Sequence, residues 1–220
     1  MQNLDTIVID EPSDVQAALA MLGLTKEKVV IIAKAAVYAR AEYLPGVDPI
    51  NFPGTRAYQA GIRQLRLLTY PDGWRPCRYR NIELVYNESM GLMFSFQNVD
   101  HACQKDEPRS ISSRGEATRE LVGRGYEVDL FGSAVPMGAV SPPNAFPTIW
   151  YICTAADERR LQVEVSRPKP FEGDQFEGFH ERIFIEDQDL DTDAILSAPT
   201  EPLDELDTEI VVTKKKNGNI

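Results

Sequence analysis

Residues 82–97 constrain the fold more than any other stretch of the chain. Two runs of β-favouring residues, 82–86 and 92–97, flank a polar turn that ends in Gly91. Along each run every second side chain is large and apolar, which gives each strand one apolar face. This pattern predicts a β-hairpin. A second hairpin is predicted over residues 149–167, and we expect the two hairpins to share one sheet.

The amount and distribution of charge restrict the partners that the chain can bind. The 220 residues, 43% of them hydrophobic, suffice for one domain with a substantial core. A net charge of -11 argues against generic binding of duplex nucleic acid, because phosphates are repelled by an acidic surface. The charge is segregated, however. Residues 51–80 contain six arginines and one aspartate, a net charge of +5, whereas residues 171–209 contain 14 acidic residues and one basic residue, a net charge of -13.

The cysteines and the start of the chain indicate a reducing compartment. The three cysteines are scattered and odd in number, so we expect no disulfide framework. The first residues lack the basic region of an export signal. The longest apolar helix candidate, residues 29–41, is interrupted by Lys34 and Arg40 and is far too short to span a bilayer. We therefore expect a cytoplasmic protein that does not contact a membrane.

Periodicity and turn residues predict an α+β fold, with N-terminal helices packed on a mainly antiparallel sheet of about five strands. Helices are predicted from residue 13 to Gly23, from Thr25 to about residue 41, over residues 55–68 and over residues 116–122. Residues 6–10 fit a short strand or an unstructured lead equally well. Further strands are predicted over residues 126–131 and 181–186. We expect these residues in or beside the core: Trp74, Leu84, Phe94, Phe96, Trp150, Ile152, Val163, Ile183 and Ile185.

Composition suggests three successive parts. A loop rich in proline and glycine, residues 43–55, separates an N-terminal helical segment, residues 1–48, from an α+β core domain, residues 49–186. Residues 98–120 form a long polar connection, which is either functional or mobile. Residues 187–220 are acidic, contain proline and show little periodicity, so we expect a flexible tail.

The basic region contains the candidate binding residues. Arginines interleaved with aromatic side chains suit the backbone and the bases of nucleic acid, but arginines can equally pair with acidic segments of the same chain or of a protein partner. Three of the arginines are expected to share one helix face, because spacings of seven and three residues are nearly whole turns. The predicted binding set is Arg56, Arg63, Arg66, Trp74, Arg75, Arg78 and Arg80.

A metal-dependent nuclease is a further hypothesis, and it would use Glu83, Asp100 and Glu164. The lysine that such sites carry shortly after a glutamate is absent, since Glu164 is followed by valine and serine. Carboxylates that converge on one point would support this hypothesis, and carboxylates on opposite faces of the sheet would oppose it. The histidines and cysteines do not have the spacing of a four-ligand zinc site. The sequence therefore predicts no catalytic residue, no metal ligand and no cofactor.

The order of the motifs over residues 50–216 resembles a family of uncharacterised bacterial proteins. The similarity is carried by Pro53-Gly54, Gly73-Trp74, Arg80-Asn81, Trp150, the run from Leu161 to Pro168, and Glu181-Arg182-Ile183. After the first hairpin that family has a Gly-Asp-Glu-x-Thr-Gly-like loop, which this chain lacks. The resemblance implies no activity, cofactor or partner.

These observations favour a non-enzymatic binding or accessory protein of an intracellular macromolecular complex. It would contact a protein partner through the arginine-rich surface, the long polar connection or the acidic tail. The alternatives are a nucleic-acid-binding protein and the metal-dependent nuclease. The sequence makes no prediction of oligomeric state.

Overall fold

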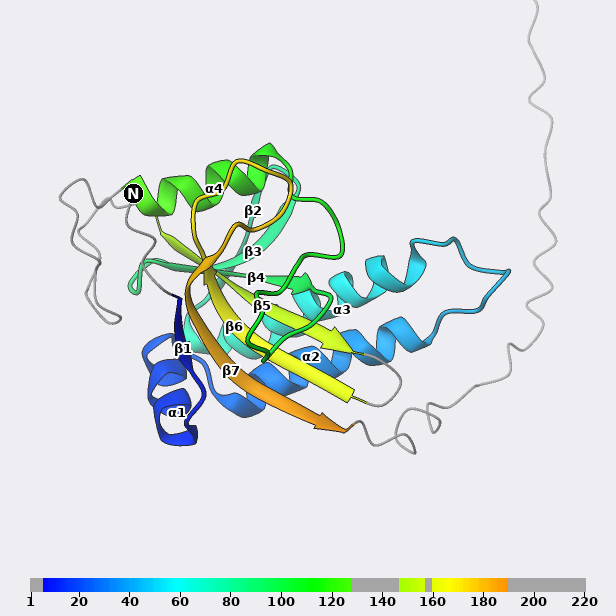
Figure 1. Ribbon diagram of the computed structural model, residues 1–220, viewed down its shortest axis with the longest axis horizontal. Helices are drawn as coiled ribbons and strands as arrows, with labels where there is room; N and C mark the ends of the chain where they lie inside the picture. Colours follow the sequence, from blue (N-terminus) through cyan, green and yellow to red (C-terminus); the bar gives the residue numbers. More distant parts are fainter. Residues whose placement is uncertain (1–5, 128–146, 157–159, 190–220) are drawn as a thin grey trace, which may run out of the picture.

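The computed structural model describes residues 6–127, 147–156 and 160–189. In these residues the chain forms one seven-stranded sheet with helices on both faces (Figure 1). The elements are β1 (Ile7–Ile9), α1 (Pro12–Met21), α2 (Lys26–Ala41), α3 (Phe52–Thr69), the 3-10 turn η1 (Tyr70–Asp72), β2 (Arg75–Tyr79), β3 (Ile82–Asn87), β4 (Leu92–Asn98), α4 (Glu116–Glu127), β5 (Thr148–Ala156), β6 (Arg160–Pro168) and β7 (Phe179–Asp189).

The sheet is mixed. Its strand order is β1-β7-β6-β5-β4-β3-β2, and the pairs β1–β7 and β4–β5 are parallel whereas the other neighbours are antiparallel. The α+β class and both predicted hairpins are thus confirmed. The expected number of strands and the mainly antiparallel description were wrong in detail. Strand β2 was missed because its Arg-Pro-Cys-Arg-Tyr sequence has no apolar alternation, and β1 has only three residues.

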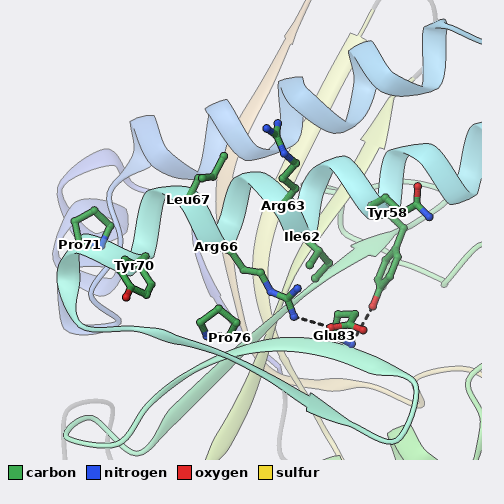
Figure 2. A pocket seen from close by; sticks show the side chains of 10 residues that line it. Tyr58, Ile62, Arg63, Arg66, Leu67, Tyr70, Pro71, Pro76 and Glu83 are labelled. Carbon is green, nitrogen blue, oxygen red and sulfur yellow. Dashed lines mark hydrogen bonds and ion pairs between the residues drawn. The ribbon is translucent and has the colours of Figure 1, made fainter.

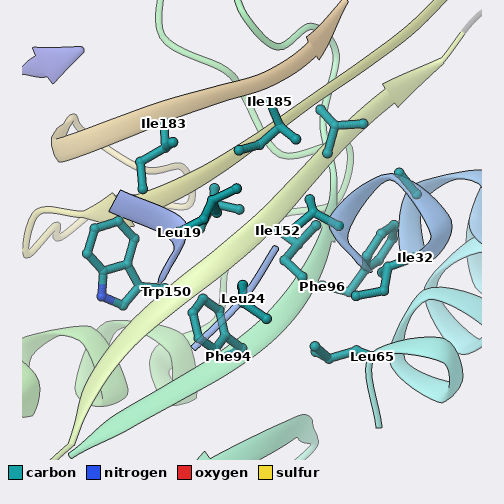
Figure 3. Close-up of a cluster of buried hydrophobic side chains, with 14 of the residues drawn as sticks. Leu19, Leu24, Ile32, Leu65, Phe94, Phe96, Trp150, Ile152, Ile183 and Ile185 are labelled. Atoms are coloured by element: carbon teal, nitrogen blue, oxygen red, sulfur yellow. The ribbon is translucent and has the colours of Figure 1, made fainter. Parts of the chain in front are cut away.

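Helices α1, α2 and α3 cover one face of the sheet and enclose the larger buried cluster (Figure 3). Phe94 and Phe96 of β4, with Ile152 of β5, lie opposite Ile32 and Leu65 of the helices. Every residue that the sequence placed in or beside the core is buried. Helices α1 and α2 therefore share the core of the sheet, and the predicted boundary at residue 48 stays a prediction.

The other face of the sheet is covered by α4, by the connection between β6 and β7, and by the segment that follows β4. Leu121 of α4, Tyr151 of β5 and Phe176 of the β6–β7 connection belong to this second buried cluster. Along β5 and β6, therefore, odd and even residues face different layers, as the two-residue period of a strand requires. This separation decides which of the candidate side chains can meet.

Some element ends agree with the predicted ones, such as the start of α2 at the N-cap Thr25, and others differ. Helix α3 begins at Phe52 with Pro53 in its first turn, where proline costs no hydrogen bond. Thr25 caps α2 by accepting a hydrogen bond from the backbone N–H of Lys28, 3.3 Å away. The predicted strand 126–131 begins inside α4, which runs to Glu127, and its remainder lies outside the described residues. The predicted tail begins inside β7, and residues 190–220 lie outside the described part.

Within residues 6–127, 147–156 and 160–189, we found no helix with both the length and the apolar composition needed to cross a membrane.

Candidate functional site

An open groove of about 490 Å³ lies between helix α3 and the β2–β3 hairpin (Figure 2). Helix α3 forms one wall, and η1 and the two strands form the other side. Both apolar and charged side chains face it. The lining residues are Tyr58, Gln59, Ile62, Arg63, Arg66, Leu67, Tyr70, Pro71, Pro76 and Glu83.

The period of α3 explains which side chains reach the groove. Tyr58, Ile62 and Arg66 are four residues apart, so they lie one above another on the helix face turned toward the hairpin (Figure 2). Arg63 and Leu67 form the adjacent row, point away from the hairpin and line the groove on its solvent-exposed side. Arg63 and Arg66 both line the groove but point to different sides of α3, and Arg56 pairs with Glu42 elsewhere, so the three arginines do not share one face as the sequence predicted. The structure adds an apolar floor that sequence reasoning missed.

Glu83 of β3 fixes the floor of the groove to the helix. Its carboxylate accepts a hydrogen bond from Arg66 Nη2 at 2.6 Å, and its other oxygen lies 3.3 Å from Arg78 Nε. The backbone N–H of Glu83 donates to the Tyr58 hydroxyl at 3.2 Å. Arg66 also donates to the Cys77 carbonyl oxygen at 3.3 Å. The charges of Arg66 and Arg78 are therefore partly neutralised within the protein.

Two arginines have no carboxylate partner among the described residues: Arg63, which lines the groove, and Arg75, which lies beside it against Tyr70. Arg63 is exposed, and its side chain makes no hydrogen bond or ion pair there. Arg75 lies over the Tyr70 ring, 4.8 Å from its centroid, and donates only to the carbonyl oxygens of Tyr70 and Trp74. Beside these cations Leu67 is 54% exposed and Tyr70 is 57% exposed. The groove thus combines exposed apolar surface with cations that are open to an external anion.

The remaining predicted binding residues lie elsewhere. Arg56 pairs with Glu42 at 2.8 Å, and Arg80 pairs with Glu120 of α4 at 2.8 Å. Trp74 is buried and packs on Phe94, with ring centroids 5.1 Å apart, so its indole offers no surface to a ligand. The paired arginines of the predicted set thus meet Glu42, Glu83 and Glu120, which lie outside the acidic region 171–209, so pairing with that region stays a prediction.

The three carboxylates proposed for a nuclease do not converge. Glu83 shares the α3 face of the sheet with Val85, whereas Glu164 lies on the α4 face, since it alternates with Val163 and Val165 of the larger cluster. Asp100 caps the loop after β4, where Oδ1 accepts the N–H of Arg109 at 2.8 Å. Within the part of the chain that the structure describes, no three histidine, cysteine or acidic residues are grouped closely enough to hold a metal ion.

The cysteines are poorly suited to nucleophilic chemistry. Burial raises the pKa of the Cys103 thiol to about 12, and the nearby Glu164 carboxylate adds to this shift. Burial also raises the pKa of Cys77, against the opposing charge of Arg66. Because the thiolate is the reactive form, neither residue supplies a nucleophile near neutral pH.

Comparison with known proteins adds no relative. A scan against models of protein families, a search of curated proteins and a search of solved structures each gave no match. The resemblance to uncharacterised bacterial proteins therefore stays a prediction, and the function has to be argued from the site itself.

Proposed function

We propose that the chain is an accessory protein that binds an extended segment of a partner protein in the groove between α3 and the β2–β3 hairpin. One observation carries this proposal: Arg63, in the lining of the groove, and Arg75, over the exposed ring of Tyr70, lack carboxylate partners within the described residues. Contiguous exposed apolar surface marks interaction sites, and the groove volume of about 490 Å³ accommodates several side chains of a bound segment.

The side chains of the groove favour an acidic and apolar occupant. Arg63 and Arg75 provide the positive charge that steers an acidic segment and sets its register. Tyr70, Pro71 and Pro76 provide a rigid aromatic and proline surface, which holds an extended peptide at little cost in conformational entropy. We therefore assign the groove to a segment in which one or two acidic residues are flanked by apolar residues.

Single-stranded nucleic acid is the second candidate occupant. The specific observation in its favour is the position of Arg75 over the ring of Tyr70, since cations and aromatic rings together bind phosphates and bases. Glu83 lies in the same groove, where its carboxylate neutralises Arg66 and Arg78 and repels phosphate. A nucleic-acid strand carries a negative charge at every nucleotide, whereas the proposed segment carries one or two, so this repulsion ranks nucleic acid below the peptide.

Site-specific crosslinking tests the proposal. A photoreactive phenylalanine derivative replaces Leu67 in the full chain, which is then irradiated in an extract of the source organism, with and without nuclease. The matched control carries the same group at Ile7, which is similarly exposed, 58% against 54%, and lies on β1 at the opposite edge of the sheet. The proposal predicts one protein crosslinked at residue 67 and absent at residue 7, through an acidic and apolar peptide that survives nuclease treatment. Crosslinks lost with nuclease would assign the groove to nucleic acid instead, and equal products at both positions would contradict a specific site.

A further inference from the structure

A second hollow, of about 530 Å³, shares Tyr58 with the groove and is otherwise lined by different residues. It forms where strands β3 and β4 part. Their backbone pairing covers only Val85–Asn87 against Leu92–Phe94, whereas β4 continues to pair with β5 as far as Asn98. Beyond the paired part, the Ser95 hydroxyl donates to the Glu83 carbonyl oxygen at 3.0 Å. The hollow therefore lies where β3 and β4 are no longer joined by backbone pairing.

Elements far apart in the sequence surround this hollow. The first turns of α3 and the end of α2 meet the parted strands and the loop that precedes α4 (Figure 1). The lining residues are Arg40, Ile50, Asn51, Gly54, Thr55, Tyr58, Asn81, Ile82, Ser95, Phe96, Gln97, Asn98, Ile111, Ser112 and Arg114. Two of these residues are arginines and none is acidic. In a chain of net charge -11, this balance is unusual.

Neither arginine of the hollow has a carboxylate partner in the described part of the chain. Arg114 is partly buried, and its guanidinium donates only to Ser112, to Oγ at 2.8 Å and to the carbonyl oxygen at 3.3 Å. The Arg40 side chain, also partly buried, makes no hydrogen bond or ion pair there. Burial lowers the pKa of both guanidinium groups, although arginine still carries its charge at neutral pH. Two desolvated cations without a counter-charge are costly unless an anion joins them.

The remaining wall supplies hydrogen-bond donors and apolar surface. The N-terminal turn of α3 contributes Gly54 and Thr55, and Asn51 at the N-cap uses its side chain for no capping hydrogen bond. The positive end of the helix dipole favours an anion. Phe96 and Ile82 supply apolar walls for the body of a ligand.

From these observations we infer that the hollow between β3 and β4 is a binding site for a small organic anion, a carboxylate or a phosphate ester on an apolar body, held by Arg40 and Arg114. The volume lies within the range of small-molecule sites. The guanidinium groups recognise carboxylate and phosphate by the same two-point geometry, so the class of anion is decided by experiment. This site is independent of the groove, and either assignment can fail without the other.

Calorimetric titration of the full chain tests this assignment with three probes of one shape: phenyl phosphate, benzoate and the neutral benzyl alcohol. We expect at least one anion to bind in a 1:1 ratio, with benzyl alcohol about tenfold weaker or more, since charge-assisted hydrogen bonds are absent. Tighter binding of phenyl phosphate assigns a phosphate ester, and tighter binding of benzoate assigns a carboxylate. No binding of either anion at millimolar concentration, or equal binding of the alcohol, would overturn the assignment.

Matched variants locate the bound anion. Arg114→Gln and Arg40→Gln should each weaken binding of the better anion by about tenfold or more. Arg109→Gln removes the same charge from an exposed side chain that lines neither the groove nor the hollow, and it should leave binding unchanged. Should Arg114→Gln fail to fold, Arg114→Lys, which keeps the charge and loses the two-point geometry, replaces it and should bind more weakly than the native chain. Native affinity in both Arg40 and Arg114 variants would overturn the assignment.

Discussion

Glu164 and Arg182 form a bidentate ion pair in which both side chains are buried. Arg182 Nη2 lies 2.7 Å from Glu164 Oε2, and Arg182 Nε lies 2.9 Å from Oε1, while the side chains are 0% and 1% exposed. The pair also anchors the loop after β4, because Cys103 N donates to Glu164 at 2.8 Å and Arg182 Nη1 donates to the Asp106 carbonyl oxygen at 3.2 Å. Stability of the α4 face therefore depends on both residues.

Arg182→Met should lower the free energy of unfolding by about 3–5 kcal/mol, because it leaves the Glu164 carboxylate buried without its counter-charge. Urea denaturation followed by circular dichroism measures this loss. In the double variant Glu164→Gln/Arg182→Met the buried charge is gone, so part of the stability should return. For comparison, Arg56→Met breaks an exposed pair and should cost about 1 kcal/mol or less. A loss for Arg182→Met as small as that for Arg56→Met would show that the buried pair does not hold this face.

Gly61→Ala should destabilise the protein even though it places a better helix former in the middle of α3. A Cβ at residue 61 would stand 2.6 Å from the Phe96 ring, which is itself fully buried in the core. We expect a loss of about 1–3 kcal/mol from overpacking. Gly123→Ala in α4 is the matched control, since nothing lies within 4 Å of its added Cβ, and it should be neutral or stabilising by up to about 1 kcal/mol. Equal effects of the two substitutions in thermal unfolding would contradict the close approach of α3 to β4.

His180 should make stability depend on pH below neutrality. Burial lowers the pKa of its imidazole to about 4, and the charges of Arg167 and Lys169 add to the shift. The unfolded imidazole titrates near 6.5, so between these values the unfolded chain binds a proton that the folded chain does not. The contribution of His180 is therefore fully present above pH 6.5 and is lost as the pH falls toward 4.

The comparison with His180→Gln isolates this effect. Glu181 acts in the opposite direction, since burial raises the pKa of its carboxyl group, but this contribution cancels between the two proteins. The free energy of unfolding of the native chain relative to His180→Gln should fall steadily when the pH is lowered from 7 to 4. A difference that is independent of pH would show that the imidazole is protonated equally in both states.

Local sequence patterns predicted much of the fold, for identifiable reasons. The alternation in β3 and β4 and the three-and-four spacing in α2 come from the layer that each side chain faces, so they were visible in the sequence. The parallel pairing of β4 with β5 could not be predicted. A long connection joins the two strands, and the residues of neither strand determine which strand pairs with it or in which direction. Strand β2 is an edge strand that pairs with β3 through its backbone. Its exposed arginines interrupt the apolar alternation by which a strand is predicted.

The candidate sites divide in the same way. Arg63 and Arg66 were named from the basic composition of their helix, and both line the groove, although they point to different sides of α3. The pairing of Arg66 with Glu83 and of Arg80 with Glu120 depends on tertiary packing, and charge counting along the sequence could not assign these partners. The hollow beside β4 escaped notice because Arg40 and Arg114 line one hollow only when α2 and the loop before α4 are folded against the parted strands.

The most direct test of the groove is the yield of the residue-67 crosslink in the variant Arg63→Glu/Arg75→Glu, compared with the single change Lys105→Glu. Lys105 is exposed in the loop after β4, which packs on the α4 face of the sheet through Cys103. If an acidic partner segment binds between α3 and the hairpin, reversal of the two groove charges should reduce the yield about tenfold or more, since like charges then face each other. Lys105→Glu should leave the yield unchanged. An unchanged yield in the double variant, with the fold intact by circular dichroism, would contradict the proposal that these arginines bind the partner.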